Sequence, residues 1–137
     1  MTKNIGIDIV EFEEIEERLT DKFIQRILSS KELIRFNAMK NQDAQIRYLA
    51  GRFAAKEAYT KVYKKFDTPL NFTDVIILND DYGAPYLQST YRPNDKVLIS
   101  ISHSRKYVVA IAILEEPDIP VPYKRVWCFY RLLCLLF

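Results

Sequence analysis

The longest stretch without helix breakers, residues 44–66, constrains the fold most. It contains no proline and a single glycine, and its apolar residues recur at helical spacing. The residues that carry this spacing are Ile46, Leu49, Ala50, Phe53, Ala54 and Ala58. They predict one long helix of several turns that packs one face on a core. The segment FDTPLNFTD then ends the helix.

Short runs rich in Ile and Val before and after this helix predict strands. NIGIDIV, residues 4–10, indicates a buried strand that ends in Asp8. Four more candidate strands follow the helix: VIIL (75–78), PYLQ (85–88), KVLISIS (96–102) and YVVAIAIL (107–114). The turns DYGAP and HSRK connect them in pairs. The expected fold is therefore α+β, with an N-terminal strand, short helices and one long central helix packed on an antiparallel sheet.

Three short helices are expected between the first strand and the long helix. EFEEIEERL places Phe12, Ile15 and Leu19 on one face and acidic residues on the other. Thr20 can cap a second helix that runs through residue 27 or 28. Ser29 and Glu32 have capping-box spacing for a third.

The 137 residues, of which 49% are hydrophobic, suffice for one folded domain, expected at residues 1–116. A Pro-rich linker at 117–122 and an apolar tail at 123–137 follow. The tail is shorter than the roughly 20 residues of a membrane helix and contains Arg131, so no membrane span is expected. A tail that packs on the domain or at an interface is the better interpretation. A net charge of +2 without a block of Lys and Arg argues against nucleic-acid binding.

Cysteine usage and the N-terminus both indicate a cytoplasmic protein. Cys128 and Cys134 have neither the spacing of a CxxC metal site nor that of a disulfide framework. Reduced thiols are the simpler interpretation. The N-terminus MTKNIGIDIV enters a strand directly and has no features of an export signal.

Two carboxylates, Asp8 and Glu57, stand in apolar surroundings where an ionised group needs a partner. Glu57 could pair with Lys61 one helical turn later, and Asp8 could cap the helix that follows it. Alternatively, both could hold Mg²⁺ together with substrate phosphates. Basic residues on and after the long helix would then face those phosphates: Arg52, Lys56, Lys61, Lys64 and Lys65. The residues alone leave these alternatives open.

His103, the only histidine, closes a candidate strand in LISISHSRKY. A lone histidine at a strand end is commonly a structural hydrogen-bonding group. Ser102, Ser104, Arg105 and Lys106 nevertheless make its turn rich in donors that suit a phosphate.

Four segments together resemble the holo-acyl-carrier-protein synthases, a family of small phosphopantetheinyl transferases. They are IGIDIVEF, GRFAAKEAYTKV, DYGAPY and ISISHSRKYVVAIAIL, in matching order over roughly residues 4–115. The resemblance implies transfer of the 4′-phosphopantetheine group of coenzyme A to a serine of apo acyl carrier protein. It implies adenosine 3′,5′-bisphosphate as the second product, Mg²⁺ as cofactor, a place in fatty acid and lipid biosynthesis, and a homotrimer with active sites between subunits.

The resemblance also implies roles for individual residues. Asp8 and Glu57 would be the Mg²⁺ ligands, and Lys61 would neutralise charge on the pyrophosphate. Residues at the nucleotide end of coenzyme A would be Arg52, Gly83, Pro85, His103 and Ser104. The proton acceptor for the serine stays open between Asp8 and a metal-bound water.

The chain departs from the family pattern at three places. YKKFDTPLNF stands where relatives carry a glycine-rich loop, so Lys64 or Lys65 could replace backbone amides near the phosphates. The first helix begins EFEEIEE, whereas many relatives carry an early basic residue that receives the acidic carrier protein. Arg18, Lys22 and Arg26 could form a docking stripe one turn later if that helix continues across Thr20, or a solvated face. The apolar tail is the third departure.

Two competing functions follow from these departures. A module that binds coenzyme A or the carrier protein without turnover would explain the missing glycine loop and the acidic first helix. An interaction protein would use the apolar tail as its functional surface.

Overall fold

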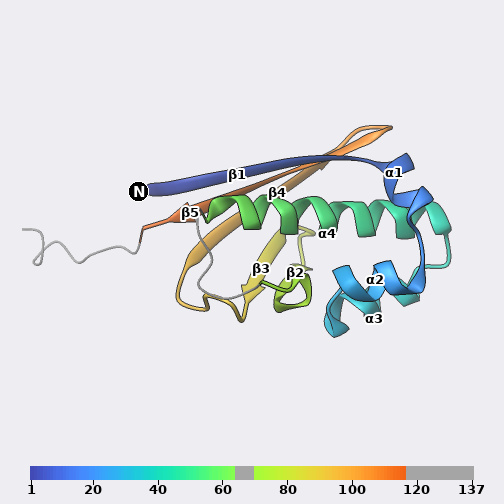
Figure 1. Cartoon of the computed structure of the whole chain (residues 1–137), viewed down its shortest axis with the longest axis horizontal. Coiled ribbons are helices and arrows are strands. Elements are labelled where there is room, and N and C mark those ends of the chain that lie inside the picture. Colours follow the sequence, from blue (N-terminus) through green and yellow to red (C-terminus); the bar gives the residue numbers. More distant parts are fainter. Residues whose placement is uncertain (64–69, 117–137) are drawn as a thin grey trace, which may run out of the picture.

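The long helix α4 (Gln42–Val62) organises the fold, and the remaining elements lie along its sides (Figure 1). The computed structural model describes residues 1–63 and 70–116. An antiparallel sheet of three strands covers one side of α4, in the order β1 (Thr2–Glu11), β5 (Tyr107–Glu115) and β4 (Lys96–His103). Away from this sheet lie α2 (Asp21–Ile27), α3 (Ser30–Ala38) and the hairpin of β2 (Val75–Asn79) and β3 (Pro85–Ser89). Helix α1 (Phe12–Glu17) follows β1, and a short 3₁₀ helix (Phe72–Asp74) precedes β2.

The predicted α+β fold is confirmed, and so are most element boundaries. Each of the four strands after α4 begins at the predicted residue and continues one residue further. Thr20 caps α2 through a hydrogen bond from the Phe23 amide. Ser29 caps α3, and the Glu32 carboxylate accepts from the Ser29 amide at 2.7 Å, which completes the predicted capping box.

The ends of α4 and β1 differ from the sequence prediction. Helix α4 ends at Val62 and not near residue 66, because Tyr63 already has an extended backbone (φ −100°, ψ 128°). Strand β1 continues past Asp8 to Glu11 and is buried on one face only. Ile7 and Ile9 on its other face are 58% and 64% exposed, so the run of β-branched residues did not indicate burial on both faces.

The core lies between the sheet and α4, and small side chains on α4 allow a close approach. Ala54, Ala55 and Ala58 are fully buried, and so is Leu49, which precedes them by more than one helical turn. Such burial stabilises the fold by about 25 cal/mol for each Å² of apolar surface removed from water. The helix therefore holds a fixed position against β1 and β5, which is a requirement for a site built across them.

Several sequence predictions fall on parts of the chain that the structure does not describe. Residues 64–69, with Lys64 and Lys65, lie outside the described residues, as do the Pro-rich segment and the tail with Cys128 and Cys134. The domain boundary at residue 116 thus stays a prediction. Within residues 1–63 and 70–116, no helix is long and apolar enough to cross a membrane.

Candidate active site on strand β1 and helix α4

The inner face of β1 contacts the C-terminal half of α4 through three alternate residues. The Asn4 side-chain amide donates to the carbonyl of Val62, the last residue of α4. Two residues on, Gly6 faces the carbonyl of Ala58. Asp8 comes next on the same face, because alternate residues of a strand point to one side. The pleat of β1 thus brings Asp8 to the side of α4 that carries Glu57 and Lys61.

Gly6 makes this approach possible, and the sequence analysis did not single it out. A Cβ atom at this position would lie 1.9 Å from the Ala58 carbonyl oxygen and 3.1 Å from Lys61 Cβ. Only a residue without a side chain allows the strand and helix to lie so close. A glycine inside a run of β-branched residues is the signal that could have identified it.

Asp8 and Lys61 form an ion pair across the strand–helix contact. Lys61 Nζ lies 2.8 Å from Asp8 Oδ1 and donates to the Ile7 carbonyl at 3.0 Å. Asp8 therefore does not cap the next helix, since it pairs with Ala110 inside the sheet and Glu11 is the N-cap of α1. Among the described residues, no ion pair joins Lys61 to Glu57. The two structural alternatives considered from the sequence are thus wrong.

Glu57 is half-buried next to this pair, and its carboxylate forms no ion pair with any side chain in the described part of the chain. Burial raises the pKa of Glu57, and the nearby Asp8 carboxylate raises it further, whereas Lys61 lowers it. The two carboxylates are therefore close enough to repel each other. Such a pair gains stability from any added cation.

Lys56 does not belong to this site, although the sequence suggested it as a phosphate-facing charge. It is fully buried and pairs with Glu32 at 2.7 Å. Its Nζ also donates to the Ile27 carbonyl. Lys56 leaves α4 on a different side from Lys61, because five residues correspond to about 500° of helical rotation, or 140°.

Arg52 connects α4 to the β2–β3 hairpin. Its Nε donates to the Ile77 carbonyl at 3.2 Å and its Nη2 donates to Asn79 Oδ1. The Asn79 amide donates in turn to the Gly83 carbonyl at 2.8 Å. Gly83 has φ +83°, a backbone conformation that favours glycine, and Pro85 pairs with Asn79 in the hairpin. The structure therefore brings Arg52, Gly83 and Pro85 into one connected region.

His103 and Ser104 form a third group, at the turn between β4 and β5. The Ser104 hydroxyl accepts from the amides of Lys106 and Tyr107, and Arg47 donates to the Ser104 carbonyl at 3.5 Å. His103 is exposed and shares the alternation of Ile101, whose side chain faces Gly51 of α4. This turn thus lies beside the N-terminal half of α4, away from Glu57 and Lys61.

The site residues expected from the sequence consequently form separate groups in one chain. Lys61 lies nine positions after Arg52, which corresponds to about 180° around a helix, so the two side chains leave α4 on opposite sides. Asp8, Glu57 and Lys61 meet on the side of β1. Arg52 contacts the β2–β3 hairpin, and His103 and Ser104 lie at the β4–β5 turn.

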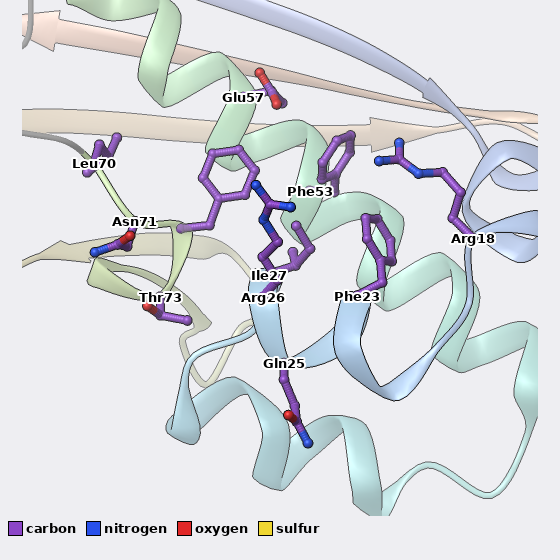
Figure 2. A pocket seen from close by; sticks show the side chains of 11 residues that line it. Arg18, Phe23, Gln25, Arg26, Ile27, Phe53, Glu57, Leu70, Asn71 and Thr73 are labelled. Atoms are coloured by element: carbon purple, nitrogen blue, oxygen red, sulfur yellow. The ribbon is translucent and has the colours of Figure 1, made fainter.

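A cavity of about 520 Å³ adjoins Glu57, between α2, α4 and the 3₁₀ helix (Figure 2). Phe23, Phe53 and Phe72 give it apolar walls, with ring centroids 5.9 Å apart in each neighbouring pair. Arg26 extends from α2 into this space, while Glu57 lies at its opposite end. Apolar walls with charged groups at the boundary suit an amphipathic ligand or peptide segment.

The predicted basic stripe is not formed as expected, because the first helix does not continue across Thr20. Arg18 is the C-cap of α1, and Thr20 begins the separate helix α2. Arg18 and Arg26 nevertheless line the same cavity. Arg18 also stacks over the ring of Phe23, with its Cζ 4.7 Å from the ring centroid.

Comparison with known proteins confirms the family resemblance. Residues 4–112 match the family model of the 4′-phosphopantetheinyl transferase superfamily. A holo-[acyl-carrier-protein] synthase of Anoxybacillus flavithermus is 44% identical over 119 residues, which cover 85% of this chain and 98% of the relative. The corresponding synthase of Acholeplasma laidlawii is 38% identical, with 84% of this chain and 98% of the relative covered.

A solved structure agrees with these relatives in fold. The holo-(acyl-carrier-protein) synthase from Bacillus anthracis, in complex with CoA (3′,5′-ADP), superimposes with a TM-score of 0.74. It is 40% identical, and the match covers 85% of this chain and 98% of that chain. The chain therefore belongs to the 4′-phosphopantetheinyl transferase superfamily, in the family of the holo-[acyl-carrier-protein] synthases.

Proposed function

We propose that this protein transfers the 4′-phosphopantetheine group of coenzyme A to a serine of apo acyl carrier protein. The serine hydroxyl oxygen bonds to the phosphorus that carries pantetheine, the pyrophosphate bond breaks, and adenosine 3′,5′-bisphosphate leaves. The serine proton goes to a base. The single observation that carries the proposal is the Glu57 carboxylate, which has no ion-pair partner among the described residues and lies beside the Asp8–Lys61 pair, in a chain that belongs to this enzyme family.

Asp8 and Glu57 fit a Mg²⁺ ion as its protein ligands. Two mutually repelling carboxylates and substrate phosphates are a typical donor set for this ion. Within residues 1–63 and 70–116, no group of three or more His, Cys, Asp or Glu side chains converges, so a dedicated all-protein metal cage is not the basis of this proposal. When bound, Mg²⁺ would neutralise charge on the pyrophosphate and favour its attack by the serine.

Lys61 is suited to the phosphates themselves. Its side chain is 50% exposed and its Nζ already points to the carboxylate that would meet the substrate. A lysine ammonium can move between an acceptor on the protein and one on the substrate, because its stem is flexible. Lys61 would thus hold the pyrophosphate next to Asp8 and Glu57.

A second copy of the chain is part of the proposal. Arg52, Gly83, Pro85, His103 and Ser104 are the expected contacts of the nucleotide end. Within one chain they lie at the β2–β3 hairpin and at the β4–β5 turn, whereas Asp8 and Lys61 pair where β1 contacts α4. Residues of two subunits would therefore form one site in a homotrimer. The outer sheet face supports association, because Ile5, Ile7 and Ile9 on it are 53–64% exposed and Leu98 on β4 is 46% exposed.

Replacing Ile7 with lysine tests the proposed site between two subunits. We expect the Ile7→Lys variant to sediment as a monomer and to lose activity, while the wild-type protein sediments as a trimer. A monomeric wild-type protein with full activity would refute the shared site.

The cavity beside Glu57 would receive the carrier-protein segment that presents the serine. Its aromatic walls can accept apolar side chains near the serine, and Arg18 and Arg26 can meet acidic residues of the carrier. We propose a cytoplasmic enzyme of fatty acid or lipid biosynthesis, where the holo carrier protein is required.

Intact-mass spectrometry of apo acyl carrier protein tests the reaction. We expect a mass gain of one phosphopantetheine group with coenzyme A and Mg²⁺, and none with a chelator. No gain with several carrier proteins, despite coenzyme A binding, would favour the alternative of a binding module without turnover. Removing residues 117–137 tests the remaining alternative, an interaction protein that uses the apolar tail. A transferase should keep its activity without these residues, whereas an interaction protein should lose its partner.

A further inference from the structure

The guanidinium of Arg52 is directed to groups of its own chain. Arg52 is 6% exposed, with Nε bonded to the Ile77 carbonyl and Nη2 to Asn79 Oδ1. Its Cζ lies 4.1 Å from the centroid of the Tyr48 ring. Burial lowers the pKa of Arg52, against the opposing effects of Tyr48 and Glu32. Arg52 is therefore held in place on several sides before any substrate arrives.

Asn79 continues this connection to the hairpin turn. Its side-chain oxygen accepts from Arg52, and its side-chain nitrogen donates to the Gly83 carbonyl at 2.8 Å. The orientation of the amide is determined by its partners, since a guanidinium only donates and a carbonyl only accepts. Among side chains of this size, only asparagine can serve both partners.

The turn itself closes without Asn79. Asp80 Oδ1 accepts from the amides of Tyr82 and Ala84 at 2.9 and 2.8 Å. The Asp80 amide donates to the Ala84 carbonyl at 2.9 Å, and the Asp80 carbonyl accepts from the Gly83 amide at 3.0 Å. Loss of the Asn79 amide should consequently leave the hairpin folded. What it removes is the link between the turn and α4.

We propose that Asn79 is a positioning residue for the nucleotide of coenzyme A, which fixes the turn at Gly83 relative to Arg52. The inference rests on the proposed function, in which Gly83 and Pro85 meet the nucleotide. In addition to the contact proposed for Arg52 itself, Arg52 then acts on the nucleotide through Asn79 and the turn. Because the reacting groups lie on the other side of α4, the link affects coenzyme A binding and leaves the chemical step unchanged.

The test variant is Asn79→Asp, which keeps the oxygen that accepts from Arg52 and removes the donor to Gly83. The new carboxylate retains its attraction to the guanidinium, so the variant should fold. We expect faster hydrogen exchange at the amides of residues 82–84. We also expect the Kd and KM for coenzyme A to rise roughly tenfold while kcat stays the same. Asn37→Asp, the same change at an exposed position of α3, should alter none of these values.

The inference would be overturned if Asn79→Asp left either the hydrogen exchange at residues 82–84 or the affinity for coenzyme A unchanged. A fall in kcat with constant KM would also overturn it. A double-mutant cycle that combines Asn79→Asp with Arg52→Lys adds a second criterion. If both residues act through one link, the double variant should bind coenzyme A no more weakly than the weaker single variant, whereas additive losses would refute the link. Failure of the proposed function is a different result, because the wild-type protein would then neither bind coenzyme A nor modify the carrier.

Discussion

Lys56 and Lys61 lie five residues apart on α4, yet they pair with carboxylates in opposite surroundings. Lys56 and Glu32 are 2.7 Å apart and both side chains are 0% exposed. Lys61 and Asp8 are 2.8 Å apart, but the lysine side chain is 50% exposed and the aspartate 16%. The same two kinds of charged group thus have nearly the same separation in two environments.

Each polar side-chain atom of the buried pair has at least one hydrogen-bond partner. Besides Lys56, Glu32 accepts from the amides of Ser29 and Ile77, at 2.7 and 3.0 Å. Lys56 also donates to the Ile27 carbonyl, and burial lowers its pKa against the effect of Glu32. The pair joins α2, α3, α4 and β2, and neither side chain is accessible to a ligand.

The exposed pair lies next to a carboxylate without an ion-pair partner in the described residues. Asp8 shares one oxygen with Lys61, and Glu57 is available beside it. Binding of a cation or a phosphate requires such available groups, since a saturated pair would have to break first. The difference between the pairs teaches that the remaining partners, more than the residue type, distinguish a carboxylate that only stabilises the fold from one that is available for binding.

The largest effect is expected from Lys56→Met, which leaves Glu32 buried without its counter-charge. It should lower the free energy of unfolding by about 3–5 kcal/mol, as in other broken buried pairs. Adding Glu32→Gln removes the remaining charge and keeps an oxygen for the Ile77 amide, so most of the stability should return. Urea denaturation measures both variants. A loss below about 1 kcal/mol in Lys56→Met would refute the structural role of the pair.

Glu57→Gln should act on the reaction and leave the fold intact. Removing one of two ligand charges should lower kcat/KM about a thousandfold, equivalent to roughly 4 kcal/mol. Glu116→Gln, at an exposed position, is the matched control and should keep wild-type rates. Equal kcat/KM values for the wild-type protein and Glu57→Gln would show that the Glu57 charge has no role in the reaction.

Two glycines, Gly6 on β1 and Gly51 on α4, give opposite expectations. Gly6→Ala places Cβ 1.9 Å from the Ala58 carbonyl oxygen, so β1 must move away from α4. This change should cost about 1–3 kcal/mol of stability, with loss of activity. In Gly51→Ala, Cβ meets its nearest neighbour at 3.8 Å, and alanine should stabilise the helix by about 0.5–1 kcal/mol. Thermal denaturation compares the two, and equal melting temperatures would contradict the close contact.

The smallest effect concerns the pH dependence of stability without metal. Because the folded state raises the pKa of Glu57, ionised Glu57 destabilises the fold relative to the neutral acid. Glu57→Gln should therefore be more stable than the wild-type protein at neutral pH, by less than about 1 kcal/mol. The advantage should disappear as the pH falls below the ordinary glutamate pKa of about 4.3. A difference that grows toward low pH would have the wrong sign.

The sequence predicted the fold well because its signals were local. Thr20 and Ser29 act on amides three residues away, and the strands after α4 alternate within a few residues. It could not predict which lysine was buried, since Lys56 and Lys61 are equally charged. Their environments depend on Glu32, which lies 24 residues before Lys56, and on β1.

The same reason explains what was missed or wrong in the candidate site. The importance of Gly6 depends on Ala58, far along the chain, and Asn79 gains its role only where Arg52 meets the hairpin. The exposed face of β1 could not be recognised either. A β-branched strand with one face exposed in its own chain has the same sequence pattern as one buried on both faces.

Isothermal titration of Mg²⁺ into the protein with coenzyme A bound tests most directly whether Asp8 and Glu57 are the available pair. The wild-type protein, Asp8→Asn, Glu57→Gln and the variant with Lys56→Met and Glu32→Gln are compared. We expect saturable binding in the wild-type protein, at least tenfold weaker binding in Asp8→Asn and Glu57→Gln, and wild-type affinity in the variant of the buried pair. Wild-type Mg²⁺ affinity in both Asp8→Asn and Glu57→Gln would contradict the assignment of these carboxylates as metal ligands.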